Sequence, residues 1–329
     1  MIKRLILLVL LFVLSIGSAN AGEKLSVFVS IVPQKYFVQQ IGKDMVDVKI
    51  MVQPGASPAT YEPKPRQMAD ISKTKLYFSI GVPFEKAWLK KIAAANPDMK
   101  VIHTDHGIEK IAMAAHHHHD EEEHHDDKHH GHKHDGDEHH GEEHNGHAHE
   151  GDHHDEKAHE DEDHHDHAGA DPHIWLSPKL VKIQAKIMLK ALQAADPSHK
   201  KEYAENFNSF AAKIDALDQD LKQIFAGKKG LQFMVFHPAW GYLAHDYGLK
   251  QVPIEIEGKD PKPAQLKELI EHAKSEDIKV IFVQPQFSTK SAELVAREIG
   301  GQVAFANPLA EDWMVNLRMI TQKFKDALK

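Results

Sequence analysis

Short runs rich in β-branched residues alternate with amphipathic stretches along most of this chain, and no other feature restricts its fold as strongly. Strands that alternate with helices in this way build parallel sheets covered by helices. The sequence therefore predicts an α/β fold. The expected strands are Leu25 to Ile31, Val46 to Val52, Lys75 to Ile80, Lys100 to Thr104, Leu231 to Phe236, Gln251 to Ile256, Lys279 to Val283 and Gln302 to Ala306. Helices are expected near Pro263 to Lys274, Thr289 to Ile299 and Asp312 to Leu328.

A long amphipathic segment separates the first four expected strands from the last four. From Ser198 to about Phe225, apolar residues recur in steps of three and four, as on one face of a helix, and Gly227 ends the pattern. We therefore expect two parallel-sheet lobes joined by one long rigid helix. The predicted domains are an N-terminal lobe (22–197), a linker helix (198–228) and a C-terminal lobe (229–329).

The first residues have the features of a secretion signal. Met1 to Arg4 is positively charged, and Leu5 to Ile16 is apolar but shorter than the roughly 20 residues of a membrane span. Small residues follow up to Ala21, so we expect a signal peptide (1–21), cleavage after Ala21 and a periplasmic protein. The chain has no cysteine, so disulfides and thiolate metal sites are excluded.

The segment from His116 to His167, called the His-rich tract below, has a composition unlike the rest. It holds 21 of the 28 histidines, 20 acidic residues and three lysines, a charge of −17 that leaves +8 for the remainder. Almost no apolar side chain is present to offset the entropy of ordering, so we predict a disordered loop inserted in the N-terminal lobe. The remainder has no basic stripe with aromatics, and we expect no nucleic-acid partner.

Histidine and carboxylate side chains in this density indicate metal binding. Neutral imidazole and carboxylate suit zinc, and also copper and nickel. An acidic spacer is the alternative, but a spacer has no need of histidine. We expect low-affinity metal handling by the tract, with candidate ligands at its two ends: His116, His117, His118, His119, His164, His165 and His167.

Two histidines outside the tract stand out by position. His237 follows an expected strand and precedes Pro238, where we expect a helix to open, so it lies at the carboxyl end of a strand, where open α/β sheets bind ligands. His173 follows the His-rich tract and lies four residues before Ser177, which can cap the next helix. If the lobes face each other, one imidazole from each can bind the same ion.

These residues also carry a family resemblance. The matching segments are Pro54-Gly55-Ala56-Ser57, Tyr61-Glu62-Pro63, Asp171 to Pro178, Phe236 to Tyr242 and Pro285-Gln286-Phe287. With the His-rich insertion, they make the chain resemble the cluster A-I, or zinc/manganese, substrate-binding proteins of ABC importers, in particular the ZnuA-like zinc receptors. The resemblance covers nearly all of the chain after the signal.

The resemblance implies a metal held between the lobes by three histidines and often an aspartate. His173 and His237 match two of these positions, whereas Ala59 replaces the remaining histidine and Asn307 replaces the aspartate. Zinc sites usually have at least three protein ligands. Glu62, a histidine of the tract or a chelator bound to the metal could complete the ligand set, and Asn307 lies near the site as a doubtful ligand.

By this resemblance the chain is a zinc receptor without enzymatic turnover, whose cargo is Zn²⁺ and whose partner is the membrane permease of an ABC importer. We expect a monomer. Three alternatives stay open: a receptor for manganese, iron or a metal chelate; a zinc storage or buffering protein; and a metallohydrolase, for which two histidines, an open metal position and Glu62 are suitable groups.

Overall fold

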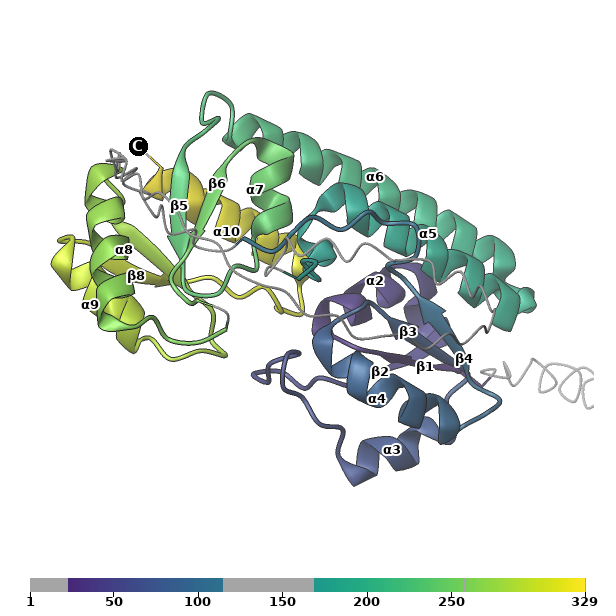
Figure 1. Ribbon diagram of the computed structural model, residues 1–329. Coiled ribbons are helices and arrows are strands. Elements are labelled where there is room, and N and C mark those ends of the chain that lie inside the picture. Colours follow the sequence, from purple (N-terminus) through teal and green to yellow (C-terminus); the bar gives the residue numbers. More distant parts are fainter. Residues whose placement is uncertain (1–22, 115–168, 257, 329) are drawn as a thin grey trace, which may run out of the picture. The chain divides into compact units, whose positions relative to one another are not determined.

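The computed structural model describes residues 23–114, 169–256 and 258–328 (Figure 1). The predicted signal peptide (1–21) and the His-rich tract (116–167) lie outside these ranges. The predicted α/β fold with two parallel sheets is confirmed, and each sheet has four strands.

The N-terminal sheet has the strand order β2-β1-β3-β4, with every neighbouring pair parallel. Its strands are β1 (Leu25–Val29), β2 (Val46–Ile50), β3 (Leu76–Ser79) and β4 (Lys100–His103). The helices of this lobe are α2 (Val32–Gly42), α3 (Pro65–Ile71) and α4 (Pro83–Ala94), each with a proline in its first turn. Proline suits that position because the first amide of a helix has no acceptor within the helix.

The C-terminal sheet repeats this topology with the order β6-β5-β7-β8, again all parallel. Its strands are β5 (Gln232–Val235), β6 (Lys250–Pro253), β7 (Val280–Val283) and β8 (Gln302–Phe305). Its helices are α7 (Gly241–Tyr247), α8 (Pro263–Ser275), α9 (Lys290–Glu298) and α10 (Trp313–Ala327). The helix expected to open at Pro238 begins at Gly241. The strands stay parallel, but β6 lies on one side of β5 and β7 lies on the other. This change in strand order leaves a crevice between the carboxyl ends of β5 and β7.

Two antiparallel helices connect the sheets. Helix α5 (Pro178–Ala195) leads through a short 3₁₀ turn, η3 (Pro197–His199), into α6 (Lys200–Ile224), the predicted long helix. Helix α6 packs against α2 in the N-terminal lobe and α10 in the C-terminal lobe (Figure 1). Its 25 residues span roughly 38 Å at 1.5 Å per residue, so one helix reaches both lobes. The predicted domain boundaries around it stay predictions.

One hydrophobic core extends across both lobes. At its centre Trp313 of α10 lies against Phe37 of α2, with ring centroids 5.2 Å apart, and Phe37 also contacts Phe210 of α6. Trp313 donates its Nε1 hydrogen to the carbonyl of Trp175 at 2.7 Å. Trp175 in turn donates to the carbonyl of Pro308 at 2.8 Å. Both indoles are buried, so these bonds fix the lobes against each other at the site described next.

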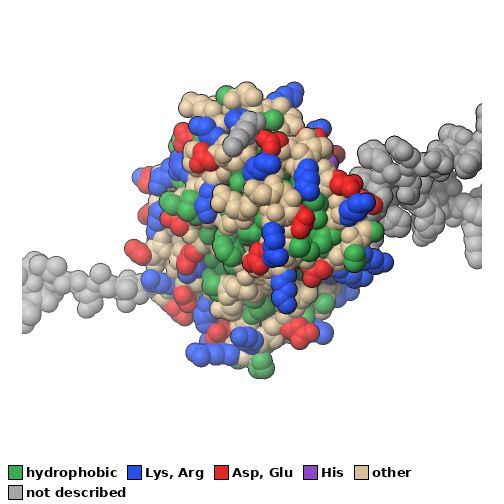
Figure 2. Space-filling view, turned by 90° about the vertical axis from the view of Figure 1, so that its left-hand side faces the viewer, with side chains coloured by type: hydrophobic (Ala, Val, Ile, Leu, Met, Phe, Trp, Pro, Cys, Tyr) green, Lys and Arg blue, Asp and Glu red, His purple; other side chains and the backbone are tan. Residues whose placement is uncertain are grey.

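The surface of the C-terminal lobe carries both signs of charge. Figure 2 shows lysine, arginine and acidic side chains interspersed on this face, with hydrophobic side chains between them. Phe305, Val315 and Met319 are the most exposed large hydrophobic residues among those described. None of the helices in the described ranges has the length and apolar character needed to cross a membrane.

Candidate metal site

His237 lies two residues beyond β5, at the crevice where the strand order reverses. Gln284, at the end of the neighbouring β7, fixes its backbone from both sides. The side-chain Nε2 of Gln284 donates to the His237 carbonyl at 2.6 Å, and Oε1 of Gln284 accepts from the His237 backbone amide at 3.3 Å. Gln284 is buried, so the imidazole projects from a rigid strand end rather than from a mobile loop.

His173 reaches the same crevice from the N-terminal side. It precedes the 3₁₀ turn η2 (Ile174–Leu176), and its amide donates to Oδ1 of Asp171 at 2.8 Å. Asp171 is fully buried and is fixed by two bonds to its backbone: its amide donates to the Ile111 carbonyl, and the Tyr242 hydroxyl donates to its carbonyl. Burial, followed by the charge of Asp171, raises the pKa of Tyr242 to about 12, so this hydroxyl keeps its proton at neutral pH.

Each imidazole is paired with a buried carboxylate at Nδ1. The distance from His173 Nδ1 to Asp171 Oδ1 is 2.7 Å, and that from His237 Nδ1 to Glu255 Oε1 is 2.6 Å. A carboxylate only accepts, so in the neutral ring the proton lies on Nδ1 and the lone pair lies on Nε2. Such outer-shell carboxylates orient metal-binding histidines and raise their basicity. The two Nε2 atoms are therefore prepared to bind a metal.

These two carboxylates were not predicted from the sequence as partners of the rings. Asp171 could have been found, because it stands only two residues before His173 in the sequence. Glu255 follows β6, 18 residues beyond His237, and only the parallel pairing of β5 with β6 brings the two together. Local spacing carries no signal for that pair.

The two imidazoles face each other. Their ring centroids are 5.2 Å apart with an interplanar angle of 70°. With Zn–N bonds of about 2.0–2.1 Å, a zinc ion on Nε2 lies roughly 3.2 Å from each ring centroid, so two rings at the tetrahedral angle have centroids about 5.2 Å apart. His237 also stacks on Phe287, and His173 lies against Trp175. The observed spacing is thus suited to one shared zinc ion.

A cavity of about 70 Å³, called the cleft cavity below, lies at the two rings. Residues of both lobes line it: Ser57, Pro58, Ala59, Val82, Pro83, Met113, Pro172, His173, Trp175, His237, Gln286, Phe287, Pro308 and Leu309. Most of these side chains are apolar, and the lining contains no charged residue from the described part of the chain. A metal in this cavity is removed from much of the surrounding water.

Ala59 lines the cleft cavity, as the resemblance implied for its position, but it offers only a methyl group. Its loop is held on α4, because the Phe84 amide donates to the Pro58 carbonyl at 3.1 Å and Tyr61 packs edge-on against Phe84. Ala59 itself is exposed, so it stands at the rim of the cavity.

Glu62 and Asn307 lie differently from the two histidines. Glu62 is exposed and is not among the described residues that line the cavity. Asn307 is half-buried beside the lining residues, and its Oδ1 accepts from the Leu309 amide at 3.0 Å and from Gln286 at 3.4 Å. These bonds give Asn307 a role in shaping the turn. As ligands, both residues stay predictions.

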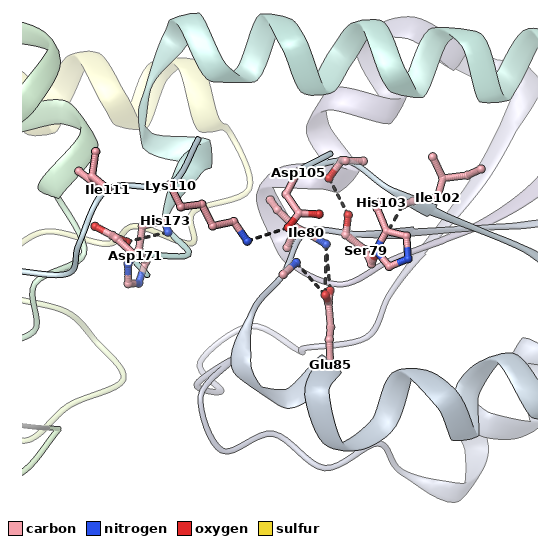
Figure 3. A network of polar contacts seen from close by, with 12 residues as sticks. Ser79, Ile80, Glu85, Ile102, His103, Asp105, Lys110, Ile111, Asp171 and His173 are labelled. Atoms are coloured by element: carbon pink, nitrogen blue, oxygen red, sulfur yellow. Dashed lines mark hydrogen bonds and ion pairs between the residues drawn. The ribbon is translucent and has the colours of Figure 1, made fainter. Parts of the chain in front are cut away.

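A network of polar contacts fixes the N-terminal loops beside His173 (Figure 3). The buried carboxylate of Glu85 accepts from the amides of Ile80 at 3.0 Å and Gly81 at 2.7 Å, and its burial raises its pKa. Lys110 pairs with Asp105 at 2.7 Å. This ion pair occupies the place where a side chain at position 81 would lie, and Gly81 leaves that place free. The segment from Asp105 to Ile111, which accepts the Asp171 amide, is therefore attached to the end of β3.

The chain leaves and re-enters the lobe next to the cavity. Ala112 forms an antiparallel bridge with Ala170, and the Met113 amide donates to the Gly169 carbonyl at 3.0 Å. Met113 lines the cavity. The predicted tract ligands at 116–119 and at 164, 165 and 167 lie outside the described residues.

Within the described ranges, no group of three His, Cys, Asp or Glu side chains is placed to hold a metal. The cleft thus provides two oriented neutral nitrogen donors, with two carboxylates behind them. The combined charge of the two carboxylates balances that of a divalent cation.

Comparison with known proteins finds zinc-uptake components among the relatives of this chain. A family model described as ZnuA, zinc-uptake complex component A, periplasmic, matches residues 27–327. The high-affinity zinc uptake system protein ZnuA of Bacillus subtilis (strain 168) is 30% identical over 296 residues, covering 89% of this chain and 81% of that protein. A crystal structure of ZnuA matches with a TM-score of 0.76 and 39% identity, covering 93% of this chain and 100% of that one. A crystal structure of a ZnuA deletion mutant with zinc bound gives 0.75 and 37%, with coverages of 93% and 99%.

Proposed function

The chain belongs to the family of the periplasmic component A of zinc-uptake complexes, and from this premise we propose that it captures Zn²⁺ outside the cytoplasm and delivers it to the membrane permease of an ABC importer. The metal enters and leaves without chemical turnover. We further propose that residues 1–21 are removed on secretion and that the protein acts as a monomer.

The observation that carries this proposal is the facing pair His173 and His237, each with a carboxylate at Nδ1. Imidazole suits zinc, whereas manganese and magnesium prefer oxygen ligands. The oriented donors at the cleft cavity are the two imidazole nitrogens, and the carboxylates lie behind them. This arrangement favours zinc over a manganese cargo.

Zinc titration by calorimetry tests the proposal. We expect the full chain to bind one zinc ion tightly and further zinc ions more weakly. The His237→Ala variant should lose the tight site, while the weaker binding by the His-rich tract continues. His245→Ala on the exposed side of α7 is the matched control and should leave the tight site intact. An unchanged tight site in His237→Ala would exclude the cleft as the site of capture.

Delivery requires a second experiment. Cells lacking the protein and supplied with the His237→Ala variant should accumulate no more zinc than cells without it, whereas the unaltered chain restores uptake. If the unaltered chain binds zinc tightly yet never increases uptake in cells with its own permease, the storage alternative replaces transport.

A further inference from the structure

The described residues give the cleft cavity fewer donors than zinc requires. Zinc takes four ligands in closed sites and keeps three from the protein in most open ones. His173 and His237 supply two, and the described residues add no third His, Cys, Asp or Glu to them. On the N-terminal rim, Ala59 presents a methyl group where a donor would complete the set.

The space at this rim is larger than a water ligand needs. The cavity measures about 70 Å³. One water requires only about 10–15 Å³ of such space, and an apolar cavity of about 150 Å³ holds a benzene molecule. The cleft cavity lies between these limits and opens at the exposed Ala59. At about half of the volume that holds benzene, it has room for only part of a small flat ring, and the remainder must extend past Ala59 toward solvent.

The chemistry of the lining restricts what such a ring can be. Asp171 and Glu255 already balance the charge of Zn²⁺, and a charged additional ligand in an apolar cavity would pay a large desolvation cost. The apolar and aromatic walls, among them Trp175 and Phe287, favour a planar neutral group. A polyanionic chelator such as citrate does not fit these walls.

Resting on the proposed function, we propose that the cleft binds Zn²⁺ together with a small ligand from solution that carries a neutral imidazole ring, of the class of free histidine, whose ring lies over Ala59 while its charged groups stay in solvent. The ring nitrogen supplies the third donor to the ion. The receptor then recognises a zinc–imidazole unit, and its affinity for zinc depends on the concentration of that ligand.

Zinc titrations of the full chain with and without imidazole test this inference. Every titration is repeated on the His237→Ala variant. This variant keeps the His-rich tract, which competes with free imidazole for zinc, but lacks the zinc site of the cleft. A ligand that joins only the zinc-bound form raises the apparent affinity by a factor of one plus its concentration over its dissociation constant. After the zinc binding of the His237→Ala variant is subtracted, we expect the zinc affinity of the cleft to rise with the imidazole concentration.

Two variants at the exposed rim make the test specific. Ala59→His should bind zinc tightly without imidazole and gain nothing from it, because the new ring occupies the space. Ala59→Leu fills the same space without a donor, so it should stay weak and also fail to respond.

The outcomes separate the inference from the proposed function. If imidazole lowers the zinc affinity of the unaltered cleft, or leaves it unchanged while Ala59→His binds tightly, zinc capture stands and the external ligand is excluded. The third donor then comes from the chain itself or from water. If neither the unaltered chain nor Ala59→His binds zinc at the cleft in any buffer, the proposed function fails as well.

Discussion

His173 and His237 lie edge to face with ring centroids 5.2 Å apart, one from each side of the cleft cavity. Both rings are expected to hold the same ion. The losses of zinc affinity caused by removing each ring should therefore not be additive. We predict that His173→Ala and His237→Ala each lower zinc affinity of the cleft by more than about 100-fold, and that the double variant is little worse than either. Calorimetry on the four proteins measures this coupling. Fully additive losses would show that the rings bind separate ions.

Glu255 should matter through His237 rather than through the metal. Glu255→Gln keeps an acceptor for Nδ1 but removes the negative charge, so we predict a loss of zinc affinity of about 10- to 100-fold. The protonation of the ring, followed by ¹⁵N NMR of the histidines, should shift toward a mixture of the two tautomers. Glu298→Gln on the exposed face of α9 is the control and should change neither quantity. Unaltered affinity in Glu255→Gln would contradict the positioning role.

Gly241 is predicted to be essential for the position of Asp171. A β-carbon at Gly241 would lie 2.6 Å from Asp171 Oδ2, closer than real contacts allow, so Gly241→Ala must displace the carboxylate that orients His173. We expect weaker zinc binding with a small loss of stability. Gly169→Ala, whose new methyl would meet nothing within 4 Å, is the matched control. Equal zinc affinity in both variants would refute this expectation.

Trp313 should stabilise the whole chain through its bond to the Trp175 carbonyl. Trp313→Phe leaves that buried acceptor without its donor and reduces the packing volume, which together cost on the order of 2–3 kcal/mol. Urea unfolding of the metal-free protein measures the change. Trp88→Phe on the half-buried side of α4 should cost far less. Similar losses for the two variants would argue against a special role of the Trp313 bond.

Acid should abolish the contribution of Asp196 to stability. Burial raises the pKa of Asp196, but hydrogen bonds from Ser198, Tyr203 and His199 outweigh it and lower the pKa from 3.8 to about 2. A lowered carboxyl pKa stabilises the fold above pH 3.8 and loses this effect as the pH falls toward 2. Asp196→Ala should therefore cost on the order of 2 kcal/mol at pH 7.

The difference between the unaltered chain and Asp196→Ala should shrink between pH 3.8 and 2. Denaturant unfolding as a function of pH measures it. Asp47→Asn, at an exposed position of β2, is the control for the removal of one carboxylate. A constant difference across this range would mean that Asp196 acts through packing rather than through its charge.

The fold was predictable because each strand and helix has a local pattern. The run Gln302 to Ala306 predicted β8 to within one residue, and the spacing after Ser198 predicted α6. The site was only partly predictable. His237 was found from its position after a strand, whereas Glu255 depends on the pairing of β5 with β6, which leaves no trace in local spacing. Whether Glu62 is a ligand is equally beyond local pattern, since it depends on how a loop side chain turns.

The core shared by the two lobes has a consequence for how the molecule unfolds. Domains that each own a core can melt separately, whereas Phe37, Phe210 and Trp313 belong to one cluster contributed by α2, α6 and α10. A second cluster, which includes Ile254, Ile281 and Val295, belongs to the C-terminal lobe alone, but loss of the shared cluster exposes apolar side chains of both lobes. The described chain should thus melt in one cooperative transition with equal calorimetric and van't Hoff enthalpies. Neither half, expressed alone, should reach the native state.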